Sequence, residues 1–194
     1  ASLMHLGGGT VNFGSLTMAS SSAAATLDIT GGQVSVNSDI TKTGSGAGTI
    51  QVANASLLVK GRIASTNDPM NTLSLDGATL SIGRLVGYGN PTSALAAAGS
   101  LSLSGTCAIA LTGTNYVVGQ FPLISYAGTI GGSGGSAAIT TTPFTPPPGV
   151  TATLVDNSAN QTIDVNITAA PPATKAILSV SPAAGSISLV WHDL

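Results

Sequence analysis

Three consecutive stretches of the chain repeat one pattern of apolar and polar positions. The apolar residues Leu27, Ile50 and Leu73 follow one another at a constant step of 23 in the numbering. Four further sets follow the same pattern: Ile29, Val52, Leu75; Val34, Leu57, Leu80; Val36, Val59, Ile82; and Ile40, Ile63, Val86. A fixed period with alternation inside it is typical of a solenoid, in which each repeat stacks on the one before.

Each repeat contains two short runs in which every second residue is apolar. In the first copy these are residues 27–29 and 34–36, and the pair Gly31-Gly32 lies between them. Such runs predict strands with one apolar face, and glycine turns the chain between them at little conformational cost. We therefore expect an all-β fold, a parallel β-helix or β-solenoid with about 23 residues per coil and strands about 4.8 Å apart, followed by C-terminal hairpins.

The repeat already runs at the beginning of the sequence. Met4, Leu6, Val11 and Phe13 precede their counterparts in the next copy by the same constant step. No polar cap precedes them, although the terminal repeats of solenoids usually carry one. Either the natural chain continues upstream, or something outside this chain covers the open end.

The pattern slips after residue 86 and resumes at Leu101 and Leu103, where the step from Leu73 and Leu75 has lengthened to 28. Within the insertion, residues 93–98 predict a short helical turn or a protrusion. The bulky residues of 116–126 predict closure of the core at its C-terminal end. We divide the chain into solenoid coils (1–130), a Gly/Pro-rich loop with a closing hairpin (131–168), and a linker with a terminal hairpin (169–194).

Two hairpins are predicted after the coils, one from residues 150–156 and 162–168, the other from 177–180 and 187–191. The second has no core of its own, and a lone hairpin is only marginally stable in water. It is either the beginning of a further immunoglobulin-like or fibronectin-like domain, or a strand pair that adds to a neighbouring copy. The predicted assembly residues are Met4, Leu6, Val11, Phe13, Ile177, Leu178, Val180, Ile187, Leu189 and Trp191.

Composition removes several classes of function. Only 6% of the 194 residues are charged, and the net charge is −2, so there is no electrostatic basis for binding nucleic acid. The sequence contains no run of about 18 apolar residues, so it predicts no helix that inserts into a membrane. The single cysteine, Cys107, excludes an intrachain disulfide and is expected to fill the core or a corner.

We find no constellation that predicts catalysis, a metal or a cofactor. The seven Asp residues are scattered, and the two histidines, His5 and His192, are far apart. Polysaccharide-degrading β-helices need clustered carboxylates, and Ser-His-Asp hydrolysis needs its three groups together. The column Thr26, Thr49, Thr72 admits an ice-binding or carbohydrate-binding face, but the strand preference of threonine explains it as well.

The repeat at residues 26–36, Thr-Leu-Asp-Ile-Thr-Gly-Gly-Gln-Val-Ser-Val, resembles the autotransporter-associated β-strand repeat of large bacterial surface proteins. The runs at 116–129, 155–157 and 163–165 are similar to the segment that closes such arrays. This resemblance spans residues 4–168 and implies a right-handed β-helix, exported from the cell, that serves as a stalk, adhesin or passenger.

From these observations we expect a protein without enzymatic activity. We expect an extracellular, cell-surface structural protein that self-associates head to tail into a filament through its solenoid ends and C-terminal tail. The alternative is a stalk segment of a large adhesin, with surface glycans as a further class of partner.

Overall fold

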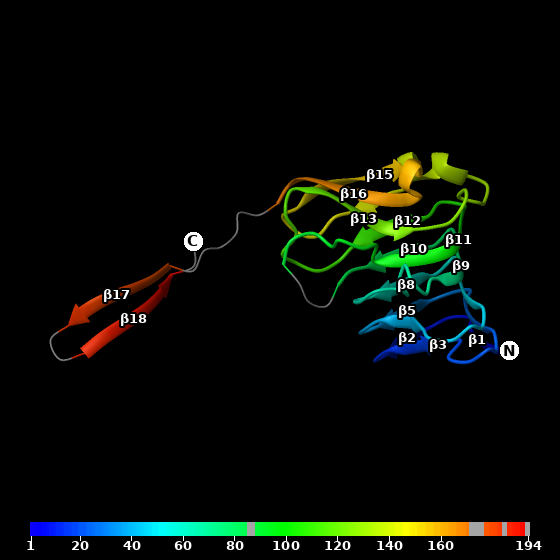
Figure 1. The fold of residues 1–194 in the computed structure, drawn as a ribbon, viewed down its shortest axis with the longest axis horizontal. Coiled ribbons are helices and arrows are strands. Elements are labelled where there is room, and N and C mark those ends of the chain that lie inside the picture. Colours follow the sequence, from blue (N-terminus) through cyan, green and yellow to red (C-terminus); the bar gives the residue numbers. More distant parts are fainter. Residues whose placement is uncertain (85–87, 171–176, 184–185, 193–194) are drawn as a thin grey trace.

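The computed structural model is an all-β chain whose strands lie mainly in parallel sheets (Figure 1). It describes residues 1–84, 88–170, 177–183 and 186–192, with the backbone alone for 140, 141 and the residues from 177 onward. The largest sheet holds, in spatial order, β1 (Ser2–Leu6), β4 (Ala25–Ile29), β7 (Gly48–Ala53), β9 (Met70–Asp76), β11 (Ala96–Ser104), β13 (Gly119–Ser125), β16 (Thr162–Ala169) and β15 (Thr151–Asn157).

A second sheet of six strands is ordered β14 (Phe144–Thr145), β12 (Ala108–Leu111), β10 (Thr79–Ile82), β8 (Ser56–Val59), β5 (Gln33–Val36) and β2 (Thr10–Phe13). Two small sheets pair β3 (Leu16–Met18) with β6 (Ile40–Lys42), and β17 (Ile177–Ala183) with β18 (Ser186–His192). The helical elements are short: η1 (Gly135–Ala137), α1 (Ala138–Thr141) and η2 (Ser158–Asn160).

The register of the parallel strands confirms the columns predicted from the repeat. Met4 pairs with Leu27, Leu27 with Ile50, and Ile50 with Leu73. Leu73 then pairs with Leu101, which confirms the longer step over the insertion. In the six-stranded sheet, Val11, Val34, Leu57, Leu80 and Ile109 form an equivalent column.

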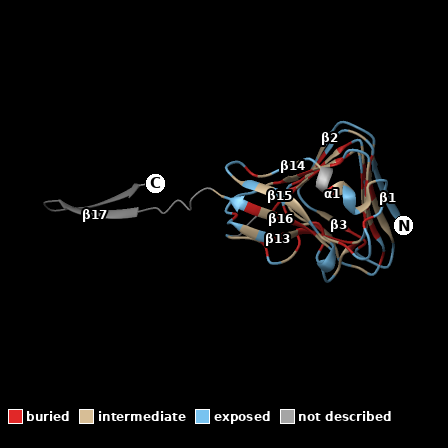
Figure 2. Ribbon diagram, turned by 90° about the horizontal axis from the view of Figure 1, so that it is seen from above, coloured by how far each residue is buried: buried red, intermediate tan, exposed pale blue. Residues whose placement is uncertain are grey.

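The core lies between the sheets and consists of these columns. Of the column residues that follow the first repeat, Leu111 is the most exposed, at 2%. Figure 2 shows the buried residues along the sheets and the exposed ones mostly in the connecting loops. Because alternate residues of a strand point to opposite faces, the alternation in the sequence places the apolar set inside.

A third stack of pairings follows the same direction. β3 pairs with β6, Ile40 forms a parallel bridge to Ile63, and Ile63 forms another to Ala96. The predicted column of Ile40, Ile63 and Val86 is therefore wrong in its last member: Ile63 pairs with Ala96, while Val86 lies outside the described residues. The insertion lies on this third stack, so the constant step of the other columns cannot hold there.

Residues 93–98 form neither a helical turn nor a protrusion. Ala96 begins β11, and residues 94–98 are all buried. Ala96 and Ala97 pair with β13, whereas residues 98 and 100–104 pair with β9, so β11 passes from one stack of strands to another. The intrinsic helix preference of alanine is overridden because the segment is enclosed between pairing strands on both sides.

The predicted hairpin near residues 150–168 is confirmed as the antiparallel pair β15–β16. β16 also pairs antiparallel with β13, and β14 pairs in parallel with β12. The segment 131–168 thus joins both large sheets of the preceding repeats. Since β15 is reversed twice relative to β13, it runs in the same direction as the parallel strands.

Candidate assembly site at the N-terminal edge

The three strands of the first repeat form one end of the stack. Within the described residues β1 pairs only with β4, β2 only with β5, and β3 only with β6. The outer edge of each strand therefore presents backbone N–H and C=O groups without a strand partner. Such edges are templates for pairing with another strand.

The apolar columns are open at this end. Met4 is 39% exposed, whereas Leu27, its neighbour in the same column, is 1% exposed. Leu6, Val11 and Phe13 are half-buried, although their counterparts in the second repeat are buried. The structure therefore places the four predicted residues of the first repeat together at one apolar edge.

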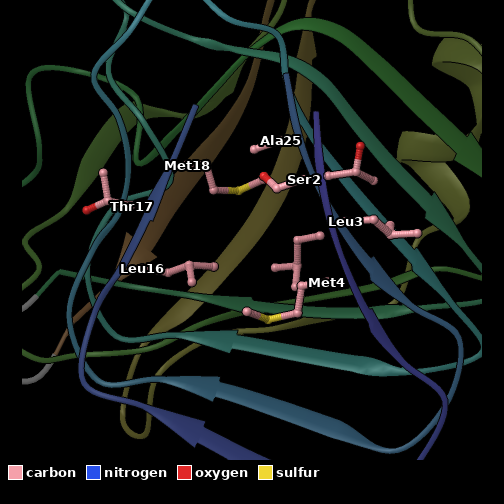
Figure 3. A pocket seen from close by; sticks show the side chains of 9 residues that line it. Ser2, Leu3, Met4, Leu16, Thr17, Met18 and Ala25 are labelled. Carbon is pink, nitrogen blue, oxygen red and sulfur yellow. The ribbon is translucent and has the colours of Figure 1, made fainter. Parts of the chain in front are cut away.

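A pocket of about 180 Å³ opens between β1 and β3 at this edge. Figure 3 shows Met4, Leu16 and Met18 extending into it from the two strands. Leu3, beside them on β1, is the most exposed large apolar side chain of the first repeat, at 68%. The pocket is lined by Ser2, Leu3, Met4, Leu16, Thr17, Met18, Ala25, Thr26 and Leu27.

The sequence-based prediction missed Leu3, Leu16 and Met18. Leu16 pairs with Ile40 and precedes it by one position more than the constant step of the repeat. The constant step alone would pair Ile40 with Thr17. The signal that was available is the alternation Leu16-Thr17-Met18 itself, which matches a short strand with one apolar face. Leu3 alternates out of the apolar column, and its exposure is visible only in the structure.

The C-terminal end of the stack is covered. Phe121 and Tyr126 are 2% and 6% exposed, and Ile139 of α1 is 2% exposed. The rings of Tyr116 and Phe121 stack with centroids 5.6 Å apart, and the Arg84 guanidinium lies 5.1 Å from the Tyr116 centroid. Bulky side chains close the core here, as the sequence predicts, so the two ends of the stack differ in kind.

Tyr116 gives this covered end a pH dependence. Burial raises the pKa of its phenol above the ordinary value near 10, and the nearby Arg84 charge partly offsets that rise. Because the folded-state pKa is the higher one, the stabilisation is complete below about pH 10 and is lost as the pH rises through the folded pKa. Tyr116 also donates a hydrogen bond of 2.8 Å to the carbonyl of Thr112.

We therefore expect Tyr116→Phe to lower the free energy of unfolding by about 1 kcal/mol at pH 7, through loss of that hydrogen bond. Above pH 10 the stability of the variant should fall less steeply than that of the wild type, because one raised phenol pKa is gone. Denaturant titrations at pH 7, 9, 10 and 11 measure both effects. An unchanged slope above pH 10 would assign the alkaline loss to other groups, among them Tyr126, whose pKa is also raised by burial and by Asp156.

The remaining predicted assembly residues belong to the terminal hairpin. Ile177, Leu178 and Val180 are on β17, and Ile187, Leu189 and Trp191 are on β18. The two strands pair with each other and join neither large sheet. Strand pairing therefore does not connect them to the N-terminal edge within this chain, and their side chains lie outside the described part of the structure.

Several polar side chains of the described residues contact one another in small, separate groups. His5 hydrogen-bonds Asp28 at 2.8 Å, and the Lys42 ammonium lies 2.5 Å from the Asp68 carboxylate. The buried carboxylate of Asp164 accepts hydrogen bonds from the Gln120 and Asn157 amides. Among the described residues, no group of three or more His, Cys, Asp and Glu is placed to hold a metal ion.

Cys107 is buried, 4% exposed, and forms no disulfide, in agreement with the prediction that it fills the core. None of the helices in the described ranges has the length and apolar character needed to cross a membrane.

Comparison of the chain with protein-family models, with curated proteins and with solved structures finds no match.

Proposed function

We propose that the chain is a β-solenoid. Support comes from the three stacks of pairings, which follow one another in the same order in each repeat: β1, β2, β3; then β4, β5, β6; then β7, β8 and the Ile63 bridge. A chain that visits three faces in turn and returns one strand spacing higher is a three-sided parallel coil. The resemblance to the autotransporter-associated repeat agrees with this architecture.

We further propose that this solenoid is a non-enzymatic structural subunit of an extracellular, cell-surface filament. The observation that carries the proposal is the open N-terminal edge, where column residues that are buried in every later repeat are left accessible. Covering that edge with another copy would bury apolar surface worth about 25 cal/mol per Å². The low charge of the chain, 6% of residues, makes such contacts insensitive to salt.

Strand direction supports head-to-tail rather than head-to-head stacking. At the C-terminal end, β14 closes the six-stranded sheet and β15 closes the eight-stranded one, and both run in the same direction as the strands of the first repeat. A second copy placed by translation would therefore meet one parallel strand at β14 and another at β15. Repeated translation does not close on itself, and it produces a fibre.

Sedimentation velocity and negative-stain microscopy of the full chain test this proposal. We expect the mean mass to rise with concentration, and rods of uniform width whose lengths are multiples of one subunit. Compact dimers of fixed mass would contradict head-to-tail assembly, and a chain that remains monomeric at every concentration would contradict self-association.

The covered C-terminal end supports a second candidate, a stalk segment of a larger adhesin. In that case Phe121, Tyr126 and Ile139 already terminate the stack, and further repeats of the same polypeptide would cover the N-terminal edge. Adding one upstream copy of the repeat distinguishes the two: a stalk segment would gain stability and stay monomeric, whereas a fibre subunit would still assemble.

A further inference from the structure

The register of the terminal hairpin assigns six apolar residues to one face. Leu178 pairs with Trp191, Val180 with Leu189, and Pro182 with Ile187. Directly paired residues share a face of a two-stranded sheet, and every second residue returns to that face. The opposite face carries Ser179, Ser181, Ser186 and Ser188, together with Ile177, Ala183, Val190 and His192.

A two-stranded hairpin with one apolar face needs a surface to cover it. Isolated hairpins are at best marginally stable in water, because they bury too little apolar area. Within the described ranges, strand edges build an accessible apolar surface at the pocket between β1 and β3, with Met4 and Leu16 in it. The other exposed large apolar side chains of those ranges are Tyr88, Val117 and Val118, which lie in loops.

The C-terminal end of the stack lacks a strand at the position that the hairpin would fill. The stack that contains β1, β4, β7, β9 and β11 ends there in a single bridge, Ser102 to Gly131, rather than in a strand of the described residues. The other two stacks end in β14 and β15. In a head-to-tail contact, β1 of the next copy would therefore meet no strand of the stack below it.

We propose that β17–β18 of one copy adds to the free edge of β1 in the next copy and lays its apolar face over the pocket of that copy. This inference rests on the proposed filament and names the segment that makes its contact. Strand addition provides backbone hydrogen bonds along β1.

The strand that precedes the linker, β16, lies far from the pocket of the same chain. The linker begins after β16, and β3 is separated from β16 by five strand spacings along the third stack, or about 24 Å. In Figure 1 β16 lies at the end of the stack opposite to β1, β2 and β3. The chain thus leaves β16 at the end of the stack where the next copy would be placed.

Trp191 is the only tryptophan and reports on this contact directly. We expect its fluorescence maximum to move to shorter wavelength as the protein concentration rises. Met4→Asp should raise, about tenfold or more, the protein concentration at which half of this shift is reached. Leu3→Asp should do the same, because Leu3 is 68% exposed and a charge at that position is tolerated without unfolding. The matched control is Val118→Asp, at an apolar position 63% exposed away from the pocket, which should leave the shift unchanged.

Cysteine cross-linking identifies the two partners. In a Cys107→Ala background, a Met4→Cys variant is mixed with a separate Leu189→Cys variant and oxidised. We expect a disulfide dimer that contains one chain of each variant. A dimer of two Met4→Cys chains would overturn the proposal in favour of head-to-head docking, and a monomeric disulfide in the Met4→Cys/Leu189→Cys double variant at high dilution would overturn it in favour of docking within one chain.

The same samples separate the failure of this inference from that of the filament. If Leu189→Asp still forms rods, the filament stands and the hairpin is not its connector. If the wild-type chain remains monomeric at every concentration, the filament itself fails.

Discussion

Leu73→Ala is expected to lower the free energy of unfolding by about 3 to 5 kcal/mol. Leu73 is fully buried in β9 and lies between Ile50 and Leu101 in its column. Truncation removes apolar contacts on both sides and leaves a cavity that parallel strands fixed by backbone hydrogen bonds cannot collapse to fill. Denaturant titration, monitored by circular dichroism, measures the loss.

The matched control for this prediction is Met4→Ala, in the same column at the open edge. Because Met4 is already 39% exposed, we expect a loss of under about 1 kcal/mol when the chain is diluted to its monomeric state. If copies associate through this edge, as proposed, the loss at Met4 should increase with protein concentration. Equal losses at both positions in the monomer would contradict the open edge.

Gly32→Ala is expected to destabilise the fold by about 2 to 4 kcal/mol. Gly32 has a φ of +72° at the corner between β4 and β5, where a side chain is strained by about 1–2 kcal/mol. A Cβ there would also lie 2.1 Å from the carbonyl oxygen of Gly9 in the repeat below. The corner would have to move away from its neighbour, which weakens the first repeat.

Gly14→Ala is the control for the corner. A Cβ at Gly14 meets nothing within 4 Å, and its backbone is outside the left-handed region. We expect no loss, and a gain of up to about 1 kcal/mol from the reduced freedom of the unfolded chain. Thermal melts of both variants and the wild type are sufficient, and a stable Gly32→Ala protein would show that the corner adapts.

Most of the parallel strand register could be predicted because it depends on local periodicity. Alternation decides which residues of a strand point inward, and the constant step decides which residues of successive repeats meet. Leu27, Ile50 and Leu73 follow from these two rules alone. The constant step fails where a loop changes length: Leu16 pairs with Ile40, and Ile63 pairs with Ala96, both across more than that step.

Other features depended on tertiary contacts that no local pattern encodes. The pairing of β13 with β16 joins segments that are distant in the sequence, and β14 consists of only two residues in a proline-rich stretch. The candidate site was predicted in part: Met4, Leu6, Val11 and Phe13 share the open edge, because they follow the repeat. Leu3, Leu16 and Met18 complete the pocket and required coordinates.

Because paired strands follow one another at a constant step, the height of this molecule changes by one strand spacing for each repeat that is added or removed. Each repeat contacts chiefly the repeats directly above and below it, so duplication of residues 27–49 would insert one more layer of about 4.8 Å while both ends keep their present surfaces. Evolution and protein engineering can therefore adjust how far such a molecule extends without redesigning the surface at either end.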